Sequence, residues 1–448
     1  MTLSTDDLCQ ALLDAAQKAG AESADAIVVQ GSSVSVDMRA GTLEHAERSE
    51  STDLGLRVLL GQKQAIVSTS DTQPKTFAAM AERAVAMAKE ALEDPYAGLA
   101  DPDQLATAWN SDALELADPA PAPHPDALQA DALAAEAAAL AVKGMSQVQV
   151  ANASYGDSRV YMAASNGFAG GYRRTSRSIS CVTIAGTGTG MERDHDGDAR
   201  TYQSDLRPAG DIGRLAGQRA VERLDARKPV TGTYPVLFDE RISSSLIGHL
   251  VAAANGSAIA RGASWLIDAL GEPVLPDALS LIEDPHRPRI AGSRRFDAEG
   301  LATHKRAIVE NGVLTGWTLD LSSARKLGMT STGNAVRGTS GPPSPASGNL
   351  RLTEGPHSRA DLIRDMGTGL LVTSMIGSTI NPNTGDYSRG AAGFWVENGE
   401  LAYPVNECTI AGNLRDMLRR IVPANDARTY LSRVVPSLLI EGMTLAGN

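Results

Sequence analysis

The sequence predicts an α+β fold with large, mostly antiparallel sheets and packed helices. Strand-like segments follow one another directly, and helices are not interleaved regularly, which is typical of antiparallel rather than parallel sheets. Asn-Gly pairs, which tolerate positive φ, lie between several of these segments and favour hairpins; they are Asn166-Gly167, Asn311-Gly312 and Asn398-Gly399. With 42% hydrophobic content over 448 residues, the chain can fill the cores of about three domains.

The first predicted domain covers residues 1–111 and combines two helices with a meander of strands. Apolar residues at helical spacing predict a helix over 5–19, ended by Gly20. A second helix is expected over 74–91. Alternating apolar and polar residues predict the strands between them, which are 26–29, 33–38, 54–60 and 63–67, with a tight turn at Gly61-Gln62.

A proline-rich stretch, residues 112–126, is expected to be a stiff, extended connector. It leads to the middle domain, residues 127–228, whose expected helices cover 126–142 and 212–226. The strands predicted between these helices are 147–155, 158–164, 170–186 and 188–193.

The third domain, residues 229–448, opens with a buried strand over 234–238 and an amphipathic helix after Glu240. This helix carries apolar residues at Ile242, Leu246, Ile247, Leu250, Val251 and Ala254. Two hairpins are expected further on, pairing 306–309 with 313–319 and 393–396 with 401–405.

The helix after Glu240 has one side chain suited to ligate a metal, His249. A lone imidazole cannot hold zinc without partners. Ser245 lies one helical turn before His249 and could act as a nucleophile with the imidazole as its base. No strained strand-to-helix turn carries a serine there, and no acid is marked as the third member, so a serine hydrolase is disfavoured. We expect a partly buried histidine satisfied by local hydrogen bonds.

A cluster of acidic residues is the second candidate metal site. The acidic residues are Glu192, Asp194, Asp196 and Asp198, and His195 lies among them. Oxygen ligands suit Ca²⁺ or Mg²⁺, but the spacing lacks the glycine and terminal glutamate of an EF-hand loop. The favoured interpretation is a solvated loop that turns at Gly197-Asp198.

Charge and cysteine content restrict the class of partner and the compartment. The net charge of −12 and pI near 5.1 argue against nucleic-acid binding. A basic stretch, Arg173, Arg174 and Arg177, is interpreted as a solvated strand face.

The three cysteines lack paired spacing; they are Cys9, Cys181 and Cys408. This spacing indicates neither a disulfide framework nor a zinc knuckle, and it favours a reducing cytoplasm. We expect neither a membrane span nor an export signal from the sequence. The segment Gly338–Pro345 is expected to be a surface loop.

Several short runs together resemble the TldD/PmbA family, historically labelled modulator of DNA gyrase and understood as metallopeptidases that act on peptides. The likeness extends over nearly the whole chain. The runs are Gly55-Leu56-Arg57-Val58, Ser68-Thr69-Ser70-Asp71, Ser165-Asn166-Gly167-Phe168, Gly188-Thr189-Gly190-Met191, Phe296-Asp297-Ala298-Glu299-Gly300, Thr332-Gly333-Asn334-Ala335, Asn381-Pro382-Asn383-Thr384-Gly385-Asp386-Tyr387 and Ile410-Ala411-Gly412-Asn413.

The resemblance implies a branch of this family that lacks the zinc motif. In the TldD branch a helix carries His-Glu-x-x-x-His, and a C-terminal cysteine completes the zinc site. Aligned on that pattern, Ser244 replaces the first histidine, Ser245 replaces the catalytic glutamate, and His249 matches the second histidine. Residues 429–448 contain no cysteine. The chain therefore resembles the PmbA (TldE) branch, with no catalytic residue and no metal of its own.

This likeness implies a non-catalytic subunit that pairs with a TldD-like subunit carrying zinc, and unfolded peptides as substrates. Peptidase activity is expected only with that partner. Two alternatives remain: a free-standing homodimer that binds peptides without catalysis, and an independent metalloenzyme that recruits distant ligands to His249.

Overall fold

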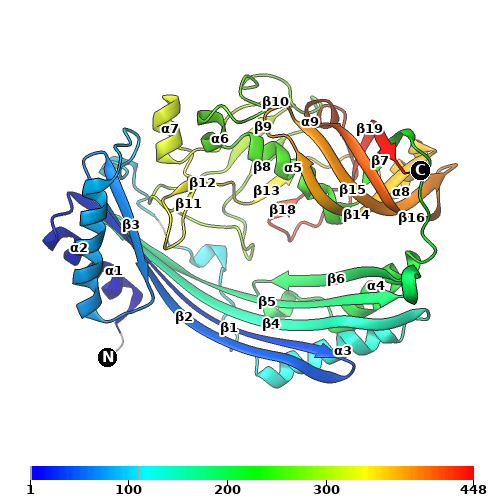
Figure 1. Ribbon diagram of the computed structural model, residues 1–448, viewed down its shortest axis with the longest axis horizontal. Coiled ribbons are helices and arrows are strands. Elements are labelled where there is room, and N and C mark those ends of the chain that lie inside the picture. Colours follow the sequence, from blue (N-terminus) through cyan, green and yellow to red (C-terminus); the bar gives the residue numbers. More distant parts are fainter. Residues whose placement is uncertain (1–2, 109, 448) are drawn as a thin grey trace.

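A six-stranded antiparallel sheet dominates the first half of the chain (Figure 1). The structure, a computed structural model, describes residues 3–108 and 110–447. The strand order is β3-β2-β1-β4-β5-β6. The strands are β1 (Ser23–Arg39), β2 (Thr42–Leu60), β3 (Lys63–Thr69), β4 (Met145–Ala164), β5 (Ala169–Ala185) and β6 (Glu192–Arg200).

Two helix pairs cover the two ends of this sheet (Figure 1). The helices α1 (Thr5–Lys18) and α2 (Pro74–Glu90) pack on β1, β2 and β3, with a core around Leu8, Leu12 and Phe77. The other pair, α3 (Pro125–Leu140) and α4 (Ala209–Glu222), packs on β4, β5 and β6. Because a Cβ on Gly213 would collide with the backbone of Ala135, the close approach of α3 and α4 requires glycine there.

The strands are longer than their hydrophobic patterns predict. The segments predicted over 26–29 and 33–38 form one strand, β1, and those over 147–155 and 158–164 form β4. Residues 42–53, which carry no apolar alternation, continue β2. The prediction of a strand over 188–193 is wrong at its start, because Gly188–Gly190 forms a short 3-10 helix and β6 begins at Glu192. A backbone ladder can extend through polar residues when a neighbouring strand supplies the hydrogen bonds.

The predicted connector is anchored to the N-terminal sheet and its neighbouring loops. Asp118 is buried, its amide donates to Thr175 Oγ1 at 2.8 Å, and its carboxylate accepts from the Gln203 amide at 2.8 Å. Beyond it, β1 and β4 are direct neighbours in the sheet. The segments on either side of residues 112–126 therefore share one sheet, and the three-domain division stays a prediction.

The second half is built around a sheet whose strand order closes on itself. The order is β16-β15-β14-β7-β19-β17, and β16 also pairs with β19. Its members are β7 (Gly232–Phe238), β14 (Gly369–Ile380), β15 (Asp386–Glu397), β16 (Glu400–Asn413), β17 (Val422–Pro423) and β19 (Leu438–Ala446). The β7–β14 pair is parallel, and the other pairings are antiparallel.

Smaller sheets and short helices complete this half. A five-stranded sheet has the order β10-β9-β8-β13-β18, and β11 pairs with β12. These strands are β8 (Leu281–Glu283), β9 (Arg306–Glu310), β10 (Val313–Leu314), β11 (Ala335–Val336), β12 (Ser344–Pro345), β13 (Leu350–Leu352) and β18 (Arg433–Val434). The helices are α5 (Glu240–Ala253), α6 (Gly256–Ala260), α7 (Leu321–Leu327), α8 (Arg359–Met366) and α9 (Leu414–Leu418).

The predicted fold class and hairpins are confirmed. Asn311 and Gly312 have φ of 48° and 82° between β9 and β10, and Asn398 and Gly399 have φ of 53° and 78° between β15 and β16. Strand β10 ends at Leu314, earlier than predicted. Among the helices that the structure describes, none is long and apolar enough to cross a membrane.

Candidate functional site

Helix α5 is the element on which the sequence places the degenerate metal motif. Asp239 caps it, because its carboxylate accepts from the Arg241 amide at 3.1 Å. Leu246, Ile247 and Leu250 are fully buried in the largest hydrophobic cluster. That cluster includes Val236 and Phe238 of β7, so packing against the sheet fixes the helix position.

The motif positions on α5 do not form a hydrogen-bonded pair. Ser245 Oγ and His249 Nε2 are both buried and have no hydrogen-bond partner among the described residues. The prediction that local hydrogen bonds satisfy the imidazole is therefore wrong for Nε2. A serine nucleophile needs a hydrogen bond to its base, so this geometry gives no support to a serine hydrolase.

The surroundings of His249 favour its neutral form. Burial and the positive charge of Arg389 lower the pKa of His249. Its ring packs edge to face against Tyr387, with centroids 5.9 Å apart. Burial also raises the pKa of Tyr387 to about 12, and its hydroxyl donates to Met375 Sδ at 3.3 Å. The lowered pKa of His249 thus favours a neutral imidazole, which packs beside an aromatic ring.

These residues do not fit a catalytic zinc ion. Within residues 3–108 and 110–447, no three His, Cys, Asp or Glu side chains are grouped as they would be to hold a metal. Zinc in a peptidase needs three protein ligands and a carboxylate that accepts a proton from its bound water. Ser244 and Ser245 supply neither, and the charge of Arg389 near His249 opposes a bound cation.

The acidic cluster at 192–198 is part of a strand, and its interpretation as a solvated loop is wrong. Asp194, Asp196 and Asp198 occupy alternate positions of β6 and are buried on one face. His195 points the other way and is exposed. Arginines from outside the strand neutralise the aspartates: Asp196 lies 2.7 Å from Arg207 and 2.8 Å from Arg219. These carboxylates are occupied by ion pairs rather than arranged to bind a metal.

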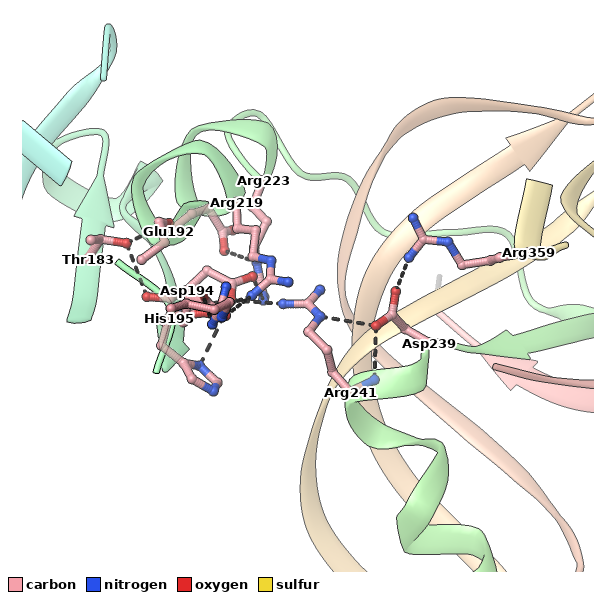
Figure 2. A network of polar contacts seen from close by, with 12 residues as sticks. Thr183, Glu192, Asp194, His195, Arg219, Arg223, Asp239, Arg241 and Arg359 are labelled. Carbon is pink, nitrogen blue, oxygen red and sulfur yellow. Dashed lines mark hydrogen bonds and ion pairs between the residues drawn. The ribbon is translucent and has the colours of Figure 1, made fainter. Parts of the chain in front are cut away.

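This network of ion pairs reaches the first turn of α5 (Figure 2). Arg223 Nη1 lies 3.5 Å from Asp194 Oδ2, and Arg241 Nη1 lies 3.3 Å from Asp194 Oδ1. The Arg241 Nε atom is 3.1 Å from the cap, Asp239, which Arg359 contacts at 2.5 Å. Burial alone would raise the pKa of Asp239, but the two arginines outweigh it and lower that pKa. A chain of alternating charges therefore joins β6 to α5.

The three arginines of the basic stretch have different environments. Arg173 pairs with Asp157 at 2.6 Å and is partly exposed, as predicted. The prediction is wrong for Arg177, which is buried and pairs with Asp131 at 2.5 Å. Arg174 donates to the Ser293 carbonyl at 2.6 Å. Two of the three side chains thus support tertiary contacts.

Four of the family-like runs meet where the N-terminal sheet contacts the C-terminal half. Phe168 and Phe296 pack edge to face with centroids 5.1 Å apart. The carboxylate of Asp297 accepts from the Ala335 amide at 3.0 Å, which joins the run 296–300 to the run 332–335. A cavity of about 20 Å³ lies at this junction, lined by Asp25, Ala26, Arg57, Leu99, Ala100, Met162, Ala163, Ala164, Phe168, Ala298, Glu299 and Arg337.

The junction contains buried charges that sequence patterns did not reveal. Arg57 and Arg337 both pair with Asp25, and all three side chains are buried. Burial and the neighbouring Asp297 raise the pKa of Glu299 to about 8. The predicted surface loop begins beside Arg337, and the Thr339 backbone lies directly against Gly55 of β2. The start of this loop is thus a contact between the two halves rather than a free surface segment.

Two further runs meet near His249. Asn413, which ends β16, donates from Nδ2 to the Thr384 carbonyl and to Asp386 Oδ1, both at 3.0 Å. Asp386 is followed by Tyr387, the residue packed against His249. The runs 381–387 and 410–413 therefore support the wall around the imidazole.

Comparison with known proteins agrees with this architecture. Three sequence profiles of one family, described as PmbA/TldA metallopeptidase domain 1, central domain and C-terminal domain, match residues 24–88, 118–224 and 231–447. The metalloprotease PmbA of Escherichia coli O157:H7 is 37% identical over 429 residues, which cover 95% of this chain and 92% of that protein. The PmbA homologue of Haemophilus influenzae is 37% identical over 97% of this chain and 94% of its own length.

Solved structures show the same fold. A protein from Bacteroides thetaiotaomicron, described as a candidate modulator of DNA gyrase, superposes with a TM-score of 0.91 and 29% identity over 98% of both chains. TldE from Thermococcus kodakarensis gives a TM-score of 0.84 at 20% identity, covering 98% of this chain and 99% of that chain. On these profiles and relatives, the chain belongs to the PmbA/TldD metallopeptidase family.

Proposed function

We propose that this protein is a non-catalytic, PmbA/TldE-like subunit of a heteromeric zinc peptidase that processes unfolded peptides. The observation that carries the proposal is the environment of α5. Ser244 and Ser245 stand at two motif positions, and the single imidazole of His249 lies near Arg389 without a hydrogen-bonded base or acid. In this proposal the zinc ion and the bond-breaking chemistry belong to a TldD-like partner.

The contribution of this chain would be to complete the walls of a substrate chamber at the subunit interface. An unfolded peptide can pair with an exposed sheet edge through main-chain hydrogen bonds, which are nearly blind to sequence. We place this complex in the cytoplasm, because Cys9, Cys181 and Cys408 are buried free thiols, as is usual for a reducing compartment.

Peptidase assays with purified subunits test the proposal. Hydrolysis of an unstructured peptide and bound zinc are measured for this chain alone, a TldD-like subunit alone, and their mixture. We expect neither activity nor stoichiometric zinc in this chain alone, and activity in the mixture. Ser244→Ala and Ser245→Ala should leave the mixture's activity unchanged. Hydrolysis by this chain alone that Ser245→Ala abolishes would overturn the proposal, and stoichiometric zinc at His249 would support an independent metalloenzyme instead.

A further inference from the structure

The N-terminal sheet has an open edge along β2. Strand β1 pairs with β2 over its whole length, but on the other side β3 covers only Leu54–Leu60. No strand in the described part of the chain pairs with that side of Thr42–Asp53 (Figure 1). Residues Thr42–Ser51 are all exposed. The backbone N–H and C=O groups of such an edge form a template for another strand.

The side chains of this edge are complementary to a second copy of themselves. Two antiparallel strands related by a two-fold axis place one residue opposite its own copy. With Ala46 at the axis, Glu44 faces Arg48 of the other strand, and His45 faces Glu47. Symmetry repeats both pairs on the other side of the axis. Residues directly opposite project to the same face of the sheet, so these side chains can meet.

Two neighbouring symmetric registers are less favourable. With Glu47 at the axis, Glu47 faces its own copy and Glu44 faces Glu50, which sets like charges against each other. With Arg48 at the axis, two arginines face each other.

A register centred on Ser49 has a different defect. It places Arg48 opposite Glu50 but brings Glu44 opposite Leu54. The open side of Leu54 is already paired with Thr69 of β3. The register about Ala46 instead uses Thr42–Glu50, which lies entirely within the open edge.

Formation of this interface would cost little free energy through the loss of existing ion pairs. In the single chain Glu44 contacts Arg39 at 3.2 Å, and Arg48 contacts Glu50 at 2.6 Å. All four side chains are about half exposed or more, so these local pairs contribute little to stability. They can exchange partners when a second strand approaches.

We propose that the open edge of β2 is a self-association surface, on which a second copy of this chain pairs antiparallel about Ala46. Two six-stranded sheets would then join into one continuous sheet. This surface lies on the N-terminal sheet and not on α5, so the proposal does not rest on the proposed peptidase role.

Sedimentation velocity of the full chain, alone, at about 1 to about 100 μM tests this surface. We expect a concentration-dependent dimer. Glu44→Arg and Arg48→Glu should each weaken dimerisation by about tenfold or more, because each sets like charges against each other on both sides of the axis. The double variant E44R/R48E restores opposite charges and should return to within about threefold of the wild type.

The control is Glu82→Arg on the exposed face of α2, which changes the net charge as Glu44→Arg does and should leave dimerisation unaltered. Thermal unfolding of each variant verifies that it is folded. A wild type that is monomeric throughout the range overturns the proposal, as does a dimer that neither single reversal weakens. A double variant as weak as the single ones overturns the register about Ala46.

Discussion

Arg241 and Asp194 form an ion pair that joins the helix of the degenerate metal motif to the N-terminal sheet. Arg241 Nη1 lies 3.3 Å from Asp194 Oδ1, although the two residues are 47 positions apart in the sequence. Both side chains are largely buried. The position of α5 thus depends on a charge network as well as on its apolar face.

Removal of the Asp194 carboxylate should destabilise the protein strongly. Asp194→Ala leaves Arg223 and Arg241 without this shared buried partner, and breaking a buried ion pair typically costs about 3 to 5 kcal/mol. The free energy of unfolding is measured by urea denaturation. Asp211→Ala is the matched control, because its pair with Arg214 is exposed and should contribute at most about 1 kcal/mol. Equal losses for the two variants would contradict a structural role of the network.

Contact between the two halves should be sensitive to a single methyl group at Gly55. A Cβ at this position would collide with the Thr339 backbone, so Gly55→Ala must displace the loop that follows Arg337. Overpacking of this kind costs about 1 to 3 kcal/mol. The control, Gly31→Ala, meets only Ser51 Oγ at 3.8 Å and should change stability by less than about 1 kcal/mol. Thermal unfolding of both variants separates the cost of the collision with Thr339 from the general effect of replacing glycine by alanine in a strand. Similar losses of stability in the two variants would indicate that Thr339 can move aside.

Glu299 should make stability fall as the pH rises. Burial and Asp297 raise its pKa from 4.5 to about 8, so between these values the folded chain holds a proton that the unfolded chain has released. Below the lower value both states are protonated, and above the higher value both are ionised. We therefore expect Glu299→Gln to remove a loss of stability that develops between pH 4.5 and about 8. Urea denaturation across this range measures it, and parallel profiles for the two proteins would contradict it.

His249 should have the opposite effect in acid. Because burial and Arg389 lower its pKa below 6.5, the unfolded chain binds the proton more readily. Stability from this group is therefore present above the unfolded pKa and is lost as the pH falls below about 6.5. Replacement by His249→Gln, which cannot titrate, should reduce the loss of stability between pH 7.5 and 5.5. If the wild type and the variant lose the same amount of stability between these two pH values, the imidazole has the same pKa in the folded and unfolded chain, and the prediction is wrong.

The amino-acid sequence is enough to predict the fold class, the hairpins and the composition of α5. Asn-Gly pairs and apolar periodicity act through local backbone geometry, so Asn311, Gly312, Asn398 and Gly399 lie in the turns that they predict. The absence of a second imidazole and a glutamate beside His249 is equally a property of the sequence.

Contacts between segments distant in the chain determine the extent of β2, the burial of the β6 aspartates and the junction around Arg337. Residues 42–53 lack an apolar face, so their strand depends on the ladder with β1 rather than on their own pattern. Arginines far along the chain form ion pairs with Asp194, and these pairs compensate for its burial. Asp25 is likewise paired with a residue distant in the sequence, Arg337. Desolvation of a charge is compensated by partners in space, and sequence periodicity contains no information on which residues those will be.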